Sequence, residues 1–499
     1  MTSSTSSSRL ASPLISVIKA VPRHPDFPVA APVDFEMNEG EIIAICGENG
    51  AGKTLLVNII TGALPLREGS VKYNIPLKDG EHFYDQLRVM AFHDAFGDLT
   101  PEYHQQRWNH GDEKTYPTVG EVLNADIEGL KNLADRNDAK SFLKWLCNTS
   151  ELEKPINWLS SGELRKFQIA KEMRHVPRVL IIDSPFIGLD AQTREQFCEV
   201  LATLARTTGL ILVMARDEDI PEFVTHVVRV DGRRVGSKVR RCDYIADVAA
   251  NVSHLSEAER NLVRDLAART PAPDVDSLLK FNDITISYFG RTILSHVSWE
   301  VLRGERWALK GPNGSGKSTL LSLVCADNPM AYACDITLFG HRRGTGESIW
   351  DIKRHIGYVS PELYRSYCKP ERVIDIVGSG LRDTNGLHRL PDDSEKAYCR
   401  QWLDLFELTN LADRSFLKIS EGEQRLVLLA RAFVKSPSLI ILDEPFHGLD
   451  SRRRQRALEI IETYVENRDK SIIMVSHYDV DFPEIIDKNL TLSKQKDYD

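Results

Sequence analysis

Four short blocks of sequence occur twice in this chain, in the same order and at a nearly constant spacing. The pairs are Gly47–Thr54 with Gly311–Ser318, Leu159–Glu163 with Ile419–Glu423, Val179–Asp183 with Leu439–Asp443, and Gly188–Asp190 with Gly448–Asp450. The first pair is offset by 264 positions and the other three by 260. A long-period repeat of this kind indicates two copies of one structural unit. The 499 residues are enough for two hydrophobic cores, one in each half.

The surroundings of the glycine-rich blocks predict the fold class. Each block follows an apolar run and precedes a helical pattern, and strand, glycine-rich loop and helix in this order form a P-loop. Further apolar runs end at or just before Asp183, Arg216, Asp443 and His477. Because strands alternate with helices, we predict an α/β fold with two P-loop NTPase domains. Each domain would have a mostly parallel sheet and a helical subdomain. The helical subdomains are expected at about residues 98–158 in the first half and 363–418 in the second.

The repeat also divides the chain into segments. We expect a flexible tail or short targeting segment at 1–12, a first domain at 13–244, a linker at 245–278 and a second domain at 279–499. Within the linker, Ser256–Arg264 has the pattern of a helix, and Pro271–Pro273 indicates an extended tether.

The glycine-rich blocks predict phosphate binding, since their backbone N–H groups and the helix N-terminus form a cradle for phosphate oxygens. Lys53 and Lys317 would reach the β- and γ-phosphates of ATP. The expected nucleotide ligands are Gly47, Asn49, Gly50, Gly52, Lys53 and Thr54 in the first block and Gly311, Asn313, Gly314, Gly316, Lys317, Ser318 and Thr319 in the second. A bound Mg²⁺ would be held by Thr54 and Asp183 in one half and by Ser318 and Asp443 in the other.

The residue after each strand-end aspartate differs between the halves. Glu444 follows Asp443 and is placed to polarise an attacking water, whereas Ser184 follows Asp183 and cannot act as a carboxylate base. We therefore predict that the two halves are not catalytically equivalent.

This set of motifs resembles that of the ABC ATPases. It comprises the P-loops, the Leu159–Glu163 type of block, the aspartate-terminated strands, the Gly-Leu-Asp triplets and a late histidine. The resemblance covers nearly the whole chain. It implies that the two domains pair head to tail within this one chain, each ATP lying between the P-loop of one and the signature block of the other. Ser160 and Gly162 would then meet the nucleotide on Lys317, and Ser420 and Gly422 the nucleotide on Lys53.

The same resemblance implies roles for residues outside the repeated blocks. His477 would contact the γ-phosphate, while Arg216 stands at the matching position of the first half. Tyr288 would stack on adenine, and the first half offers His24 or Phe27 instead. We call the site on Lys53 site one and the site on Lys317 site two. Only site two has the whole catalytic set, which is Glu444, His477 and Lys317.

A narrower resemblance rests on residues 339–360, which are similar to the molybdenum-transport or photorepair type of tandem ATP-binding protein and to its fungal relatives. Members that drive transport generally have a glutamine at the strand end before the helical subdomain. This chain has Asp94 and Glu362 near the matching places, so coupling to membrane helices is in doubt.

Charge and hydropathy restrict the partners. The net charge of −9 does not favour a general nucleic-acid-binding protein. Of the basic segments, Arg233–Arg241 is expected to form a hairpin and Arg452–Arg456 to lie on a solvated helix face. No apolar run is long enough to span a bilayer, so a membrane permease would be a separate chain.

The first residues bear on localisation. They are rich in Ser and Thr, contain Arg9, and have no acidic residue before Asp26, which is typical of a mitochondrial transit peptide. A disordered tail on a cytoplasmic protein is the alternative. Either way we expect a soluble intracellular protein, because no secretory apolar segment is present.

These features predict an ATP-hydrolysing mechanical switch whose two halves close on ATP and reopen after hydrolysis, mainly at site two. Its cofactors would be ATP and Mg²⁺, and its protein partner is not apparent from the sequence. The alternatives are an ATPase subunit of a membrane transporter, a ribosome-associated translation factor, and a binding module that uses ATP only structurally.

Overall fold

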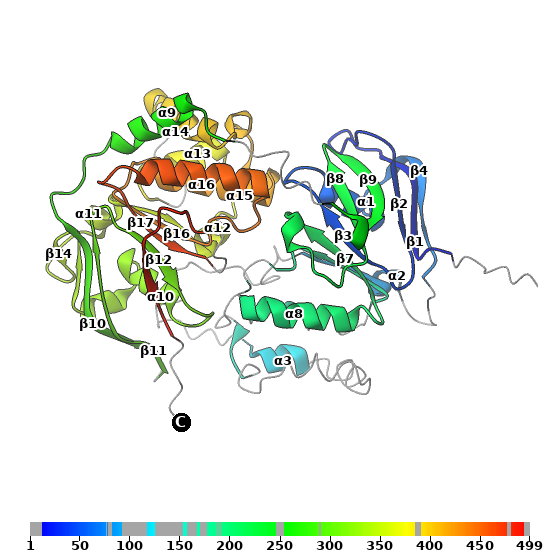
Figure 1. Cartoon of the computed structure of the whole chain (residues 1–499), viewed down its shortest axis with the longest axis horizontal. Helices are drawn as coiled ribbons and strands as arrows, with labels where there is room; N and C mark the ends of the chain where they lie inside the picture. The colour runs from blue at the N-terminus through cyan, green and yellow to red at the C-terminus, as the bar shows by residue number, and fades with distance from the viewer. Residues whose placement is uncertain are drawn as a thin grey trace, which may run out of the picture.

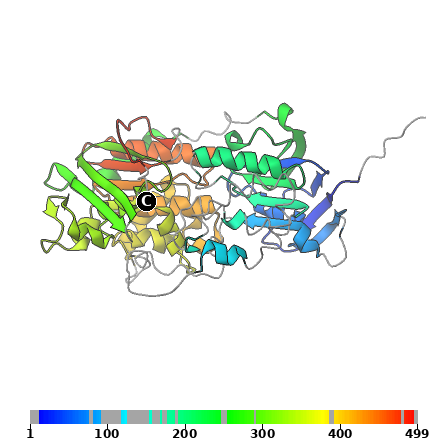
Figure 2. The same cartoon turned by 90° about the horizontal axis from the view of Figure 1, so that it is seen from below.

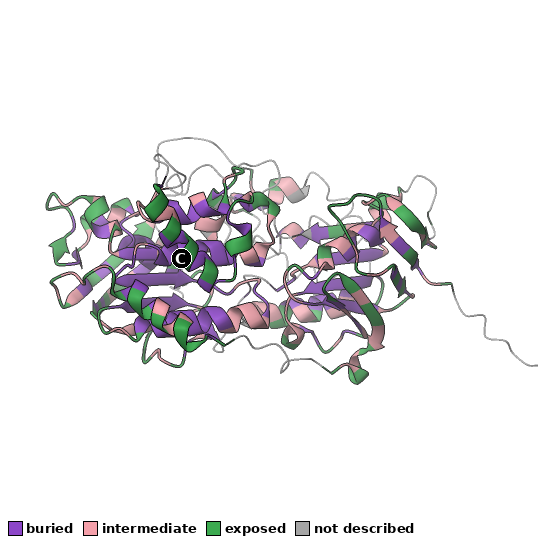
Figure 3. Cartoon of the chain, turned by 90° about the horizontal axis from the view of Figure 1, so that it is seen from above, coloured by how far each residue is buried: buried purple, intermediate pink, exposed green. Residues whose placement is uncertain are grey.

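A computed structural model of the chain describes residues 12–75, 77, 82–91, 117–124, 153–156, 167–169, 177–186, 189, 191–245, 254–288, 291–384, 391–476 and 481–493. Two lobes lie side by side along the long axis of the molecule (Figures 1 and 2). The first lobe contains the strands of the N-terminal half and the second those of the C-terminal half. Buried residues concentrate in the central strands of both lobes, so each half has its own core (Figure 3).

The central sheet of the first half has the strand order β5-β6-β7-β3-β8-β9. Its strands are β3 (Ile42–Cys46), β5 (Leu87–Ala91), β6 (Val179–Asp183), β7 (Gly209–Met214), β8 (His226–Asp231) and β9 (Arg234–Arg240). All neighbours are parallel except β8 and β9, which form the expected hairpin. The residues of β3 and β7 are buried throughout, as in a parallel sheet covered on both faces.

Two layers cover this sheet. On one face, α1 (Lys53–Ile60) packs in a common core with β1 (Ile15–Pro22), β2 (Val33–Met37) and β4 (Leu66–Tyr73), which form an antiparallel sheet of order β2-β1-β4. On the other face, α8 (Ala191–Leu204) contributes Phe197 and Leu201 to the core. Shorter elements are α2 (Phe83–Gln86), α3 (Val119–Asn124), η3 (Asp217–Asp219) and η4 (Arg241–Asp243).

The second half repeats this arrangement. Its central sheet has the order β15-β16-β17-β12-β18, with every neighbouring pair parallel. The strands are β12 (Arg306–Lys310), β15 (Ile356–Val359), β16 (Leu439–Asp443), β17 (Ser471–Val475) and β18 (Lys488–Thr491). The helices on it are α10 (Lys317–Val324), α11 (Ile349–Lys353) and α16 (Ser451–Val465). The P-loop strand thus lies between matching neighbours in both halves, and the predicted α/β fold with parallel sheets is confirmed.

An antiparallel sheet of order β11-β10-β13-β14 accompanies the second parallel sheet. Its strands are β10 (Ser277–Tyr288), β11 (Arg291–Leu302), β13 (Ile336–Leu338) and β14 (His341–Arg342), next to η5 (Pro329–Ala333). Neither antiparallel sheet follows from the repeated motifs. The helical subdomain expected near 363–418 is present and comprises α12 (Pro361–Ser366), α13 (Val373–Ser379), α14 (Asp393–Leu405), η6 (Thr409–Leu411) and η7 (Phe416–Lys418), leading into α15 (Glu421–Phe433).

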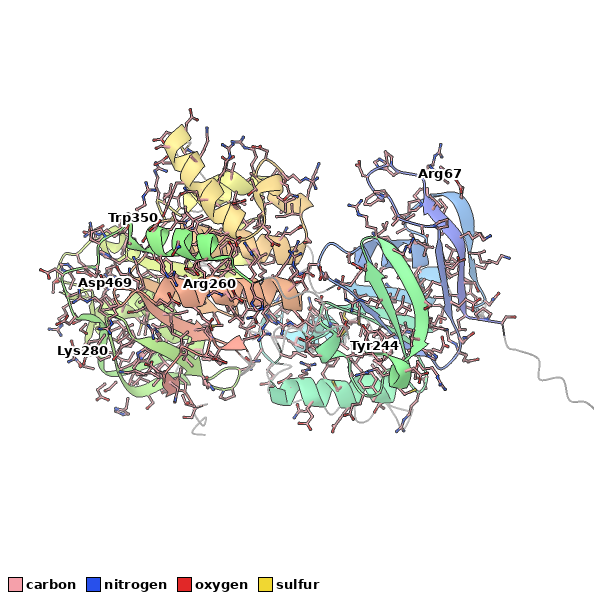
Figure 4. The ribbon with its side chains drawn as sticks, turned by 45° about the horizontal axis from the view of Figure 1, so that its top comes forward. Arg67, Tyr244, Arg260, Lys280, Trp350 and Asp469 are labelled. Carbon is pink, nitrogen blue, oxygen red and sulfur yellow. The ribbon has the colours of Figure 1, made fainter. Side chains whose placement is uncertain are left out.

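The linker contains the predicted helix, α9 (Glu257–Ala268), which begins with a capping box between Ser256 and Glu259. This helix packs on α16, where the Glu459 carboxylate accepts hydrogen bonds from the Leu255 backbone and from Arg260. Figure 4 labels Arg260 on this helix. Further along, the Arg269 guanidinium lies 3.9 Å from the centre of the Tyr398 ring. The segment from 254 onward is therefore attached to the second half over its length and is not a free tether.

The expectation of a solvated face for Arg452–Arg456 is wrong for most of this run. The Arg456 side chain is 7% exposed and bonds to the Leu405 carbonyl and the Glu259 carboxylate. Arg454 is paired with Asp481 and Arg453 with Glu423. These arginines join the first turns of α16 to α9, α15 and the segments around Leu405 and Asp481. In the part of the chain that the structure describes, no helix is long and apolar enough to cross a bilayer.

Candidate functional site

The two glycine-rich loops have the same backbone geometry. Gly52 (φ 107°) and Gly316 (φ 91°) are left-handed N-cap residues of α1 and α10, which favours glycine at both places. A Cβ atom on Gly47 would lie 2.1 Å from the Val230 carbonyl oxygen, so a side chain there would collide with backbone. Both loops therefore lead the chain tightly into a helix N-terminus, the geometry that binds phosphate.

The P-loop lysines bridge their own loops. The Lys53 ammonium donates to the carbonyls of Gly47 and Glu48 at 2.7 and 2.9 Å. The Lys317 ammonium donates to those of Gly311 and Pro312 at 2.7 and 3.1 Å. Burial lowers the pKa of Lys53, and the nearby carboxylates of Asp183 and Asp450 act in the opposite direction. Each lysine thus joins two carbonyls of its own loop and holds the loop in the cradle shape.

The oxygen donors expected to hold Mg²⁺ are accessible or lie at strand ends. Thr54 and Ser318 are exposed in the first turns of α1 and α10, and Asp183 and Asp443 are the last residues of β6 and β16. Among the residues that the structure describes, no group of three or more His, Cys, Asp or Glu forms a metal cage. One hydroxyl and one carboxylate per half fit Mg²⁺, which keeps waters and substrate phosphates among its ligands.

The residue after each strand-end aspartate adopts one unusual conformation in both halves. Ser184 has φ 55° and Glu444 has φ 51°, both in the left-handed region that costs non-glycine residues free energy. The backbone N–H groups bond to the carbonyls of Val213 and Val475, each at 2.9 Å. The same turn therefore presents a hydroxyl in the first half and a carboxylate in the second.

The side chains at these two turns have different surroundings. The Ser184 hydroxyl donates to the Asp183 carboxylate at 3.1 Å. The Glu444 carboxylate lies 2.9 Å from Nδ1 of His447, and both side chains are largely buried. His447 was not identified from the sequence as a site residue, because it follows the repeated strand motif and has no separate signature.

The second half contacts the first-half P-loop directly. The Asn49 backbone N–H donates to the Asp450 carboxylate at 2.9 Å, and the Asn49 amide donates to the Gly448 carbonyl at 2.5 Å. A Cβ atom on Gly422 would lie 1.9 Å from the Asn49 amide nitrogen, so α15 begins against this loop. Ser420 caps α15 and is partly buried. The signature block of one half and the P-loop of the other thus lie together at site one.

Arg216, which stands at the sequence position that matches the late histidine, lies at the same interface. Its guanidinium donates to the carbonyls of Phe446 and Leu449, each at 3.1 Å, and lies 3.8 Å from the Asp481 carboxylate. All three partners belong to the second half. This side chain reaches across the interface and is engaged there, although its sequence position matches that of the late histidine.

The candidate adenine contacts are Tyr288 in the second half and His24 or Phe27 in the first. The Tyr288 hydroxyl and the buried Asn328 amide are hydrogen bonded, with the Asn328 nitrogen 2.8 Å from the hydroxyl oxygen. Burial raises the pKa of Tyr288. In the first half, His24 and Phe27 have ring centres 5.9 Å apart, on a loop tied to Arg233 by the Ala30 N–H. The Arg233 backbone packs on Gly52.

Several predicted site residues lie outside the described part of the chain. They are Ser160, Gly162, His477, Asp94 and the side chain of Glu362. Site one is therefore described from both halves, whereas site two is described from the second half alone. Asp450 could have been found from the sequence, since it belongs to a repeated triplet, but its contact with Asn49 depends on the pairing of the halves.

Comparisons with known proteins agree with this architecture. The family model for the ABC transporter matches residues 30–187 and 294–447. The Escherichia coli ABC transporter ATP-binding protein ModF is 33% identical over 463 residues, covering 91% of this chain and 91% of the relative. An ABC transporter ATP-binding protein of Schizosaccharomyces pombe is 27% identical and covers 94% of this chain and 96% of its own length.

Solved structures show a similar fold. An RNase-L inhibitor aligns with a TM-score of 0.52 and 18% identity, covering 91% of this chain and 83% of that protein. A chain from a model of ribosome-bound archaeal Pelota and ABCE1 aligns with a TM-score of 0.58 and 18% identity, covering 95% of this chain and 75% of that one. At this identity the likeness concerns the fold alone.

Proposed function

Because this chain belongs to the ABC transporter family of ATP-binding proteins and is an ABC-type ATPase, we propose that it hydrolyses ATP mainly at site two and acts as a mechanical switch. The observation that carries this proposal is the pair of matching turns after β6 and β16. One turn presents the Glu444 carboxylate and the other the Ser184 hydroxyl. Of these two groups, only the carboxylate can accept the proton of an attacking water at neutral pH.

At site two, Glu444 orients the water and takes its proton, and Lys317 stabilises the charge on the transferred phosphoryl group. His477, Ser160 and Gly162 complete this site from the positions that the family resemblance assigns them. Tyr288 supports the adenine. Mg²⁺ held by Ser318 and Asp443 would neutralise phosphate charge when bound.

Site one has all the groups expected to bind nucleotide. They are the cradle of Gly47–Thr54, the strand-end Asp183 and the opposing Ser420 and Gly422. These groups bind nucleotide and hold Mg²⁺ on Thr54 and Asp183, but no carboxylate follows Asp183. Nucleotide at site one therefore persists through several turnovers of site two. It keeps that edge of the domain interface closed while the site-two edge opens and closes.

The test of this proposal is Glu444→Gln, which keeps the shape of the side chain but removes the base. Turnover falls about 10²–10⁴-fold while ATP binding is retained. Ser184→Ala, the matched change in the first half, leaves phosphate release close to wild type. Near-normal phosphate release by Glu444→Gln refutes the assignment of the base.

Two kinds of partner are considered for the switch: a membrane permease in a separate chain and the ribosome. The relative in Escherichia coli is named an ABC transporter ATP-binding protein, which favours a permease in a separate chain. The similar fold of a ribosome-bound protein favours a translation factor. In the described part of the linker, α9 is packed on α16, which argues against the latter, because this helix does not project as an arm that could reach a ribosome. Affinity capture with Glu444→Gln, followed by tests for a co-purifying permease and for ribosome co-sedimentation, separates the two.

The location of the protein in the cell remains a prediction from residues 1–12. A mitochondrial protein would be imported and would lose its Ser- and Thr-rich N-terminal segment, and a cytoplasmic one would keep that segment. Fractionation with N-terminal sequencing of the mature chain distinguishes them.

A further inference from the structure

The loop that follows Glu444 is held by the first half at three of its backbone carbonyls. We call residues 446–450 the crossing loop. Its Gly448 carbonyl accepts from the Asn49 amide, and its Phe446 and Leu449 carbonyls accept from the Arg216 guanidinium. First-half side chains thus bind three carbonyls of a loop that begins two residues after the proposed base. Little freedom remains for this loop while the contacts are intact.

The surroundings of Arg216 fix its guanidinium at this place. The side chain is 10% exposed, and the planar fork of arginine suits two carbonyls at once. Asp481, 3.8 Å away, also accepts from Arg454 of α16 and from Ser476. Arg216 is therefore surrounded by second-half acceptors, and moving it elsewhere would leave the carbonyls of Phe446 and Leu449 without this donor in a buried setting.

The crossing loop also contains the residue whose side chain contacts the proposed base, Glu444. His447 lies within it, and its Nδ1 is 2.9 Å from the Glu444 carboxylate. The carbonyls on either side of His447 are those of Phe446 and Gly448, which the first half binds. Fixing these carbonyls fixes the backbone that carries His447, and through it the orientation of Glu444.

We propose that Arg216 is a positioning residue for hydrolysis at site two, acting from the first half through the crossing loop on Glu444. This inference rests on the proposed function, since it takes Glu444 as the base of site two. Arg216 then raises the rate of the chemical step and contributes little to nucleotide affinity, because the two glycine-rich cradles are formed by other residues. The matching position that holds a histidine in the second half has a different task in the first.

The experiment compares Arg216→Ala, Arg216→Lys and a matched control, Ser451→Ala, in the full-length protein. Ser451 donates to Glu218 at 3.0 Å across the same interface without touching the crossing-loop carbonyls. Single-turnover phosphate release, the KM for ATP and the nucleotide retained after rapid gel filtration are measured for each. Each substitution is also made together with Glu444→Gln.

Arg216→Ala is expected to lower the single-turnover rate about 10- to 100-fold, the effect of losing charge-assisted hydrogen bonds to two carbonyls. KM and the retained nucleotide stay within about twofold, as for an interaction realised only in the chemical step. Arg216→Lys recovers part of the rate, since lysine keeps the charge but not the fork. Ser451→Ala behaves like wild type, and Arg216→Ala adds nothing to Glu444→Gln because both act on the same group.

A normal single-turnover rate for Arg216→Ala overturns the inference. So does loss of retained nucleotide with an unchanged rate, which would place Arg216 on the phosphate of site one. If Arg216→Ala does not fold, Arg216→Lys decides, and a wild-type rate for that variant also overturns the inference. Failure of the proposed function is seen separately, as normal turnover by Glu444→Gln alone.

Discussion

The two halves of this chain share a strand order and a phosphate cradle, but they differ in the residue after the strand-end aspartate, which is Ser184 in the first half and Glu444 in the second. In the first half, the P-loop residue Asn49 and Arg216, which lies just after β7, both reach the other half and bind its backbone. In the second half, the residues that receive these contacts directly follow Glu444. Among the described residues, the first half thus binds the backbone of the loop that follows the carboxylate of the second half.

This difference shows how two copies of one ATPase domain can acquire different roles through a few side-chain substitutions. The turn after β6 keeps the strained geometry of its counterpart, with Ser184 at φ 55°, although serine has no use for it as a base. The backbone of a catalytic turn thus remains where the carboxylate is absent. On the proposed function, site one uses its remaining polar groups for binding nucleotide and for holding the partner domain.

The largest expected effect that tests this comparison comes from the P-loop lysines. Lys317→Ala lowers turnover about 10²-fold or more, because it removes transition-state charge stabilisation at the only site with a carboxylate base. Lys53→Ala, its matched control, lowers turnover far less and instead weakens nucleotide retention at site one. Steady-state phosphate release and retained nucleotide are the measurements. Equal losses of kcat in the two variants would show that the halves work symmetrically.

A smaller effect is expected at the packed edge of site one. Gly422→Ala introduces a methyl group 1.9 Å from the Asn49 amide, which must rotate and lose its bond to Gly448. Losing one hydrogen bond accelerates nucleotide release from site one about two- to tenfold. In the double variant with Asn49→Ala, Gly422→Ala has no further effect. Additive effects of the two changes would mean that the methyl group acts elsewhere.

The smallest effect concerns the linker helix α9, which packs on α16 of the second half. Burial raises the pKa of Glu259, but hydrogen bonds from Ser256 and Arg456 outweigh this and bring it to about 2. A carboxylate whose folded-state pKa is depressed stabilises the fold above its unfolded value of 4.5, and this stability is lost as the pH falls toward 2. Glu259→Gln removes this dependence and costs about 0.5 kcal/mol near neutral pH, or roughly 1–2 °C in Tm.

The matched control is Glu257→Gln, in the same turn of α9 but 75% exposed. It leaves both the Tm and its pH dependence nearly unchanged. If Glu257→Gln and Glu259→Gln shift the unfolding of the protein equally, the contact with Arg456 does not fasten the linker.

Local motifs made much of the fold and part of the site predictable. The glycine-rich loops, the strands ending at Asp183 and Asp443, and the helix begun by Ser256 each carry their signal within a few residues, so their structure follows from sequence alone. The turns of Ser184 and Glu444 were located in the same way. Their shared left-handed conformation was not, because neither residue type favours it.

Contacts between distant segments could not be predicted. Arg216 binds carbonyls 230 and 233 positions away, and a backbone acceptor has no residue type that marks it in a sequence. The arginines after Asp450 looked like a solvated face because their periodicity is polar, yet Arg456 is buried by the Glu259 carboxylate and the Leu405 carbonyl. Hydrogen bonds to these two groups offset the free-energy cost of burying the Arg456 charge. The partners come from distant parts of the chain, so the sequence around Arg456 does not identify them.

The most direct test of unequal sites is the stoichiometry of a single turnover. Protein loaded with ATP at both sites is mixed with Mg²⁺, quenched, and analysed for phosphate released and ATP remaining on the chain. The account predicts a rapid release of about one phosphate per chain, with the nucleotide at site one still ATP. Rapid release of about two phosphates per chain, with no ATP left bound, would contradict it.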